Sequence, residues 1–150
     1  ISAEGYSYTT NLVDQSELPI GSAVRSRMLH GKSCSAKQYL DALNQMNLWR
    51  AEFSEQMNDI DALVTPTTID CAIPVDEVDE QVLPAHFTRA TNVLGLCALA
   101  IPSAHSPDDL PISICIHGHP FQDSHILRIG WALEQAFGES SRIPRGLELE

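Results

Sequence analysis

Histidine is the residue type of this sequence whose spacing best suits metal chemistry. One histidine cluster occurs, His117-Gly118-His119, with His125 nearby. Alternate residues of an extended segment point to the same side, so the imidazoles of His117 and His119 could meet one metal ion. A third ligand at motif spacing is missing, and a histidine at a strand end is common. We therefore assign no metal or cofactor and keep a metal-binding domain as an open alternative.

The four cysteines, at positions 34, 71, 97 and 115, show no Cys-x-x-Cys spacing. Cys115 falls inside a predicted buried strand and Cys97 lies at the start of another, and this placement favours free thiols that pack as small apolar groups. Free thiols are consistent with a reducing compartment, so we expect a cytoplasmic protein. The carboxylates of Asp59, Asp61 and Asp70 flank another predicted strand and could pair. Asp59 and Asp61 fit better as residues that end a helix and solvate a turn.

Motifs for phosphate binding or acyl transfer are missing from the sequence. The eight glycines never form Gly-x-Gly-x-x-Gly, and a Gly-x-Ser-x-Gly elbow does not occur. The two lysines, Lys32 and Lys37, lie around the start of a long predicted helix, where we expect them to be solvated. The residues alone therefore identify no reaction.

Helices are predicted where apolar residues recur every three or four positions. A helix over about 36–58 begins with a capping box, in which Ser35 and Gln38 satisfy each other's backbone donors. Shorter helices are predicted over 21–32 and from about Pro84 to Leu94, where Gly95 supplies a left-handed cap. A last helix follows Phe121 and ends at Gly138.

Three short apolar segments are predicted to be strands: 62–65, 98–101 and 112–117. Helices that alternate with such strands indicate an α/β fold, with a mixed sheet flanked by helices. The acidic segment 67–83 is predicted to be a solvated loop.

Length and composition fit one soluble globular domain. The chain has 150 residues, of which 43% are hydrophobic, and its formal net charge is −11. That charge repels phosphate backbones and anionic lipids, so we expect neither nucleic acid nor a membrane surface as a partner. Residues 1–19 are predicted to be an irregular arm, residues 20–138 the folded segment and residues 139–150 a polar tail. The pair Leu149–Glu150 could be a cloning remnant, and the absence of methionine at Ile1 suggests a piece of a longer or processed polypeptide.

Several short segments follow one another in a distinctive order: Asp61-Ala-Leu-Val-Thr-Pro-Thr67, Phe87-Thr-Arg-Ala-Thr-Asn92 with Val93-Leu-Gly95, Ala98-Leu-Ala-Ile-Pro102, Leu110-Pro-Ile-Ser-Ile114, Gly118-His-Pro-Phe121 and Ile126-Leu-Arg-Ile-Gly-Trp-Ala-Leu-Glu134. This order resembles the C-terminal third of the amidase signature family of hydrolases. The similarity runs from about residue 20 to residue 138. Several family positions differ, because Cys97 replaces a proline, Asp109 and Ser113 replace glycines, and Cys115 replaces a glutamine.

The resemblance implies a serine hydrolase that cleaves carboxamide C–N bonds. Such enzymes use a serine nucleophile, a second serine in a cis linkage and a lysine that acts as a neutral base. All three belong to the family's N-terminal portion, so we assign no catalytic residue to this chain. Ligand clefts of α/β sheets lie beyond strand ends, and Thr67 and Thr68 are therefore candidate pocket residues. Asn92 matches a family asparagine, although we expect a hydrogen bond to nearby backbone instead.

Two hypotheses follow for the chain as a whole. In the first, it is the C-terminal segment of an amidase, inactive alone. Its partners are then the N-terminal remainder of the same polypeptide, a small-molecule amide and, as an option, further copies of itself. In the second, it is a truncated, non-catalytic paralogue that acts as a structural or interaction module.

Overall fold

The computed structural model describes residues 1–82 and 84–138, so the predicted polar tail and the pair 149–150 lie outside the described residues. The chain divides into two compact units rather than the single domain expected from its length. Residues 1–48 and 79–82 form the first unit, and residues 49–78 and 84–138 belong to the second. The division falls within the long helix α3 (Ala36–Gln56), which buries no residue of its own.

The first unit begins with a helix where an irregular arm was predicted. Helix α1 spans Ser2–Val13, so that prediction is wrong for most of residues 1–19. Its hydroxyl-bearing residues bond to carbonyls of the preceding turn: Ser7 to Glu4 at 2.7 Å, Thr9 to Gly5 at 2.7 Å and Thr10 to Tyr6 at 2.6 Å. These bonds satisfy the hydroxyl groups. The packing of α1 against α2 and η1 explains how a polar sequence without clear periodicity is helical.

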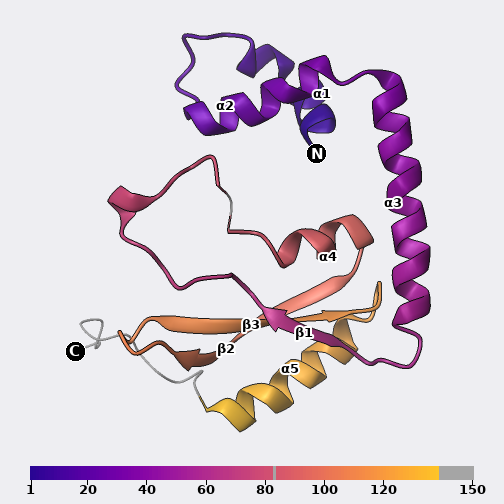
Figure 1. Cartoon of the computed structure of the whole chain (residues 1–150), viewed down its shortest axis with the longest axis vertical. Helices are drawn as coiled ribbons and strands as arrows, with labels where there is room; N and C mark the ends of the chain where they lie inside the picture. The colour runs from indigo at the N-terminus through magenta and orange to yellow at the C-terminus, as the bar shows by residue number, and fades with distance from the viewer. Residues whose placement is uncertain (83, 139–150) are drawn as a thin grey trace. The chain divides into compact units, whose positions relative to one another are not determined.

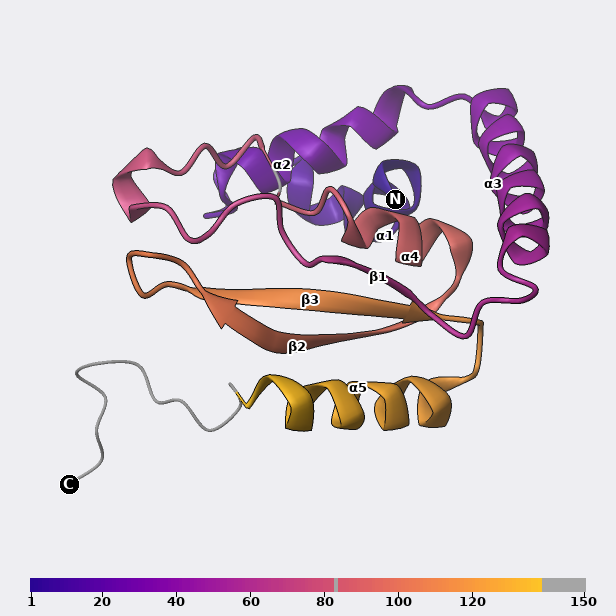
Figure 2. The same cartoon turned by 60° about the horizontal axis from the view of Figure 1, so that its bottom comes forward.

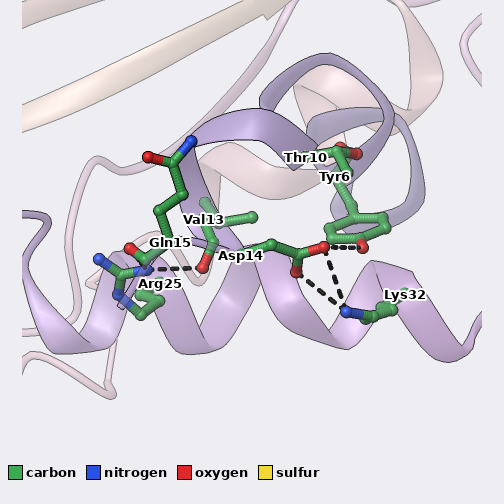
Figure 3. Close-up of polar contacts among 7 residues, drawn as sticks. All are labelled: Tyr6, Thr10, Val13, Asp14, Gln15, Arg25 and Lys32. Atoms are coloured by element: carbon green, nitrogen blue, oxygen red, sulfur yellow. Dashed lines mark hydrogen bonds and ion pairs between the residues drawn. The ribbon is translucent and has the colours of Figure 1, made fainter. Parts of the chain in front are cut away.

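A guanidinium group fixes the chain after α1 to the next helix. Helix α2 spans Ser22–Leu29 and continues into the 3-10 helix η1, His30–Ser33, in agreement with the predicted helix over 21–32. From α2, Arg25 donates to the carbonyls of Val13 at 2.6 Å, Gln15 at 2.8 Å and Leu18 at 2.8 Å. Figure 3 shows this side chain beside the end of α1. The carbonyl of Val13 lies at the helix end and lacks a partner within the helix, and Arg25 supplies a donor for it. The carbonyls of Gln15 and Leu18 belong to the segment that follows α1, which the same guanidinium group holds against α2.

Helix α3 begins as its sequence predicts. The backbone N–H of Ser35 donates to Oε1 of Gln38 at 2.9 Å, and the N–H of Gln38 donates to Oγ of Ser35 at 3.2 Å. This is the reciprocal capping box. The apolar stripe predicted along the helix is half-buried at Leu43, Met46, Arg50 and Phe53. Leu40 of the stripe is 57% exposed, and Leu48 and Trp49, which lie off the stripe, are 58% and 49% exposed.

The second unit contains a three-stranded antiparallel sheet, seen in Figure 1. Strands β1 (Leu63–Pro66), β2 (Cys97–His105) and β3 (Pro111–Gly118) adopt the order β1-β3-β2. All three predicted strands are therefore present, and β2 is longer than expected. A register shift between Pro102 and Ala104 lets the strand continue past its internal proline.

Helices lie on both faces of this sheet (Figure 2). Helix α5 (Asp123–Phe137) covers one face, where Ile101, Ile116 and Ile126 form the buried core. Helix α4 (Thr88–Leu94) lies on the opposite side. The predicted α/β arrangement of helices around a sheet is confirmed, but the three described strands pair only antiparallel and do not form the mixed sheet that was expected.

The boundaries of the last two helices agree with their predicted caps. Both α4 and α5 end at a glycine in the left-handed region, Gly95 at φ 71° and Gly138 at φ 70°. The start of α4 was predicted four residues too early, because the helix begins at Thr88 and not at Pro84. Residues 67–82 of the loop before α4 are largely exposed, as their charges predict, and include the short 3-10 helix η2 (Val75–Glu77).

Candidate functional site

Thr67 and Thr68 follow β1 directly and differ in what their hydroxyls do. The N–H of Thr67 donates to the carbonyl of Ser113 at 3.1 Å, which extends the ladder between β1 and β3 by one residue. The Oγ1 atom of Thr67 is buried and has no hydrogen-bond partner among the described residues. The hydroxyl of exposed Thr68 donates to the carbonyl of Asp70 at 2.8 Å. Thr67 thus holds an unused polar group at the strand end, which is costly unless something else satisfies it.

Asn92 lies on α4 and is exposed. The sequence favoured a hydrogen bond from its side chain to nearby backbone, but the side chain makes none with the described residues. The backbone at this helix end is satisfied by another residue, since Arg50 Nε donates to the carbonyl of Val93 at 2.9 Å. The amide of Asn92 is therefore available on the surface of α4.

The sequence did not predict a buried polar cluster centred on His117. This side chain is 3% exposed and lies on β3. Its Nε2 is 2.9 Å from Oγ1 of Thr65 on β1, and its Nδ1 is 2.7 Å from Oγ1 of Thr91 on α4. Strand alternation could have indicated the ring's direction, because Ile116 faces α5 and its neighbour must face the other side. Only the fold shows that two threonines lie within hydrogen-bond distance of the ring on that side of the sheet.

Burial changes the titration of both ionisable groups in this cluster. Desolvation lowers the pKa of His117 and raises the pKa of Cys115, whose Sγ is 4.0 Å from His117 Nδ1. Both shifts favour the neutral form. The pair is therefore a thiol beside a neutral imidazole rather than the thiolate and imidazolium of a cysteine nucleophile.

The proposed metal pair of His117 and His119 is not assembled. His119 is partly buried, and its Nε2 lies 3.2 Å from the carbonyl of Ile60, while both ring nitrogens of His117 contact threonines. Within residues 1–82 and 84–138, no group of three His, Cys, Asp or Glu side chains could hold a metal ion. The carboxylate of Asp61 instead lies 3.5 Å from Nε2 of His125.

Both lysines lie against a carboxylate. Lys32 Nζ lies 3.0 and 3.2 Å from the two carboxylate oxygens of Asp14, which also accepts from the hydroxyl of Tyr6 at 2.9 Å (Figure 3). These hydrogen bonds raise the pKa of Lys32 and lower the pKa of Asp14. Lys37 forms an ion pair with Asp41 one turn along α3. Lys32 is therefore poorly suited to act as a neutral amine base.

Two shallow depressions lie in the first unit, away from the three predicted pocket residues. The larger, about 480 Å³, is lined by Ser22, Arg25, Ser26, Leu29, His30 and Ser33. The second lies between the start of α1 and the start of α3. Neither includes Thr67, Thr68 or Asn92.

Comparison with known proteins decides the family. The model of the family described as Amidase matches residues 6–127. This chain belongs to the amidase family. The match begins earlier than the sequence motifs suggested and includes most of α1.

Amidase relatives are much longer than this chain. It is 31% identical over 133 residues to a glutamyl-tRNA(Gln) amidotransferase subunit from Methylacidiphilum infernorum and covers 27% of that protein. It is 30% identical over 127 residues to the corresponding protein from Acidobacterium capsulatum and again covers 27%. These alignments include 83% and 79% of the present chain.

Solved amidase structures share the fold. A crystal structure of an amidase superposes with a TM-score of 0.80 over 92% of this chain and 34% of its own, at 24% identity. Helices around a sheet are therefore the amidase architecture in this segment. None of the helices within residues 1–82 and 84–138 has the length and hydropathy needed to cross a membrane.

Proposed function

We propose that this chain is the C-terminal segment of an amidase-signature serine hydrolase that cleaves carboxamide C–N bonds. The observation that carries the proposal is the family match over residues 6–127, together with relatives of which this chain spans about a quarter. The serine nucleophile, the second serine and the neutral lysine lie in an N-terminal part of the same polypeptide. The segment contributes strands and helices to the shared core.

The segment also supplies one wall of the acyl pocket, at the end of β1. The buried, unsatisfied Oγ1 of Thr67 supports this role, because a substrate oxygen or amide would complete its hydrogen bonding. Asn92 supports the same role from α4, where its exposed amide can both donate and accept. Thr68 lies at the rim, with its hydroxyl already bonded to Asp70.

Hydrolysis of small carboxamides, measured as ammonia release, tests the activity. We expect the 150-residue chain to be inactive and the polypeptide that includes the N-terminal part to be active. Turnover by the chain alone, with one of its own serines acylated, would overturn the proposal. A native product that is no longer than this chain would support the truncated, non-catalytic paralogue instead.

The pocket wall is tested by a matched pair of variants in the active polypeptide. Thr67→Val removes the orphaned hydroxyl, and Thr68→Val removes the bonded one. Loss of one substrate hydrogen bond corresponds to about a five-fold rise in KM for Thr67→Val, whereas Thr68→Val should leave KM unchanged. Equal effects of the two substitutions would remove Thr67 from the pocket.

A further inference from the structure

The imidazole of His117 joins three elements of the second unit. It projects from β3, contacts Thr65 of β1 through Nε2 at 2.9 Å and contacts Thr91 of α4 through Nδ1 at 2.7 Å. The side chain is 3% exposed, so water is not a ready substitute for either threonine. Nε2 thus has the hydroxyl of Thr65 as its partner, and Nδ1 has the hydroxyl of Thr91 at 2.7 Å and the more distant thiol of Cys115 at 4.0 Å.

The direction of these hydrogen bonds follows from Thr65. Its Oγ1 lies 2.9 Å from the carbonyl oxygen of Pro66, which can only accept, so the single hydroxyl proton of Thr65 is used there. The oxygen of Thr65 must then accept from His117, which places a proton on Nε2. In a neutral ring the other nitrogen carries none, so Nδ1 accepts from the hydroxyl of Thr91.

We propose that His117 is a positioning residue, a neutral Nε2–H tautomer that carries a one-way hydrogen-bond chain from Thr91 through the ring to Thr65 and the carbonyl of Pro66. These hydrogen bonds fix α4 against β1. The significance of this arrangement rests on the proposed function. Asn92 directly follows Thr91, and Thr67 follows Thr65 by two residues, so the same chain sets the spacing between both parts of the pocket wall.

The surroundings of the ring keep it in this state. Cys115 on β3 is the titratable group beside it, with Sγ 4.0 Å from Nδ1, while β1 and α4 present the hydroxyls of Thr65 and Thr91. On β2, Ala98 lies opposite His117 in the register. No charged side chain among the described residues forms an ion pair with the ring, and burial lowers the pKa of His117. A proton on Nδ1 would point at the hydroxyl proton of Thr91, so the Thr91 hydroxyl would have to rotate before it could accept a hydrogen bond.

The tautomer of His117 is measured directly by NMR of the 150-residue chain with ¹⁵N-labelled histidine. Long-range proton–nitrogen correlations distinguish a protonated Nε2 from a protonated Nδ1, and His117→Gln identifies the resonances of His117. We expect protonated Nε2 and unprotonated Nδ1 at neutral pH. A protonated Nδ1 with a bare Nε2 would overturn the proposal, whether or not the polypeptide hydrolyses amides.

Two nearly isosteric substitutions test the direction of the hydrogen bonds made by His117. Thr91→Val removes a donor that serves only the neutral ring, so the pKa of His117 should rise by up to about one unit. The oxygen of Thr65 is an acceptor that stabilises the imidazolium form of His117 more than the neutral form. Thr65→Val removes this acceptor, so the pKa of His117 should fall. Thr88→Val, on the same helix, is the matched control and should leave the titration unchanged. Shifts of the same sign in the Thr91 and Thr65 variants would contradict the assignment.

The positioning role has its own readout in the active polypeptide. Thr91→Val should raise KM for the amide while Thr88→Val does not, and Thr91→Ser, which keeps the hydroxyl, should restore KM. An active polypeptide whose KM is unchanged by Thr91→Val would overturn the positioning role. A polypeptide that lacks amidase activity would instead refute the proposed function. The NMR measurement would still test the tautomer of His117, because it does not depend on activity.

Discussion

Burial is the main influence on His117, and it has a consequence for stability. Desolvation lowers the pKa of this histidine in the folded chain, whereas the unfolded chain titrates near the ordinary value of about 6.5. In acid the unfolded state therefore binds more protons than the folded state. Stability from this residue is fully present above the unfolded pKa and is lost as the pH falls through it, down to the lowered folded pKa.

Urea unfolding at about pH 7.5 and about pH 5 measures this effect. We expect the free energy of unfolding to decrease in acid, and to decrease less in His117→Gln, which retains a donor and an acceptor but does not titrate. Because other titrating groups are common to both proteins, the difference between their pH dependences isolates His117. Parallel pH profiles would contradict the predicted shift.

Among the contacts between secondary-structure elements, the close approach of η1 to α1 depends on Gly31, which has no side chain. A Cβ at Gly31 would overlap the backbone carbonyl of Ser2 and the Cβ of Tyr6, neither of which can rotate away. The helices would have to separate. A Cβ at Gly21, which precedes α2 as its N-cap, would meet nothing within 4 Å.

The two glycines allow the same substitution at a crowded and an open position. Gly31→Ser should destabilise the first unit by about 1–3 kcal/mol, as overpacking does. Gly21→Ser should be neutral or slightly stabilising, because serine is a good N-cap. Thermal unfolding followed by circular dichroism provides the comparison. A Gly31→Ser variant as stable as Gly21→Ser would show that η1 and α1 are not in such close contact.

At the scale of the whole molecule, the chain leaves much apolar surface uncovered. On α5, Leu127 is 58% and Trp131 is 66% exposed, and the ring of Phe121 is 99% exposed although its backbone adopts a left-handed φ of 63°. Left-handed backbone is costly for a bulky residue, and exposed rings gain no burial energy in return. Surfaces of this kind promote association.

We expect the chain expressed alone to self-associate in sedimentation experiments as its concentration rises. Replacing Leu127 and Trp131 by glutamate should reduce association, because it places charge on the exposed side of α5. Gln135→Glu adds a charge to the same helix at an exposed polar position and should have little effect. A stable monomer of the unmodified chain at high concentration would refute this expectation.

Local sequence determined the elements whose signals are short-range. The capping box at Ser35, the left-handed glycines at Gly95 and Gly138 and the three β-strands were all predicted correctly, since each depends on neighbouring residues. Helix α1 was missed, because its polar sequence has no clear apolar period and the helix packs against α2 and η1, a contact that the local sequence does not reveal. The family resemblance, carried by the order of several weak motifs, was confirmed.

Tertiary structure alone decided which polar groups are satisfied. Thr65, Thr91 and His117 are far apart in the sequence and meet only because β1, β3 and α4 are brought together. Thr67 and Thr68 are adjacent and chemically identical, yet one hydroxyl is buried without a partner among the described residues and the other is bonded at the surface. Residue type and spacing determine what an element is, whereas burial and hydrogen-bond partners depend on what packs against it.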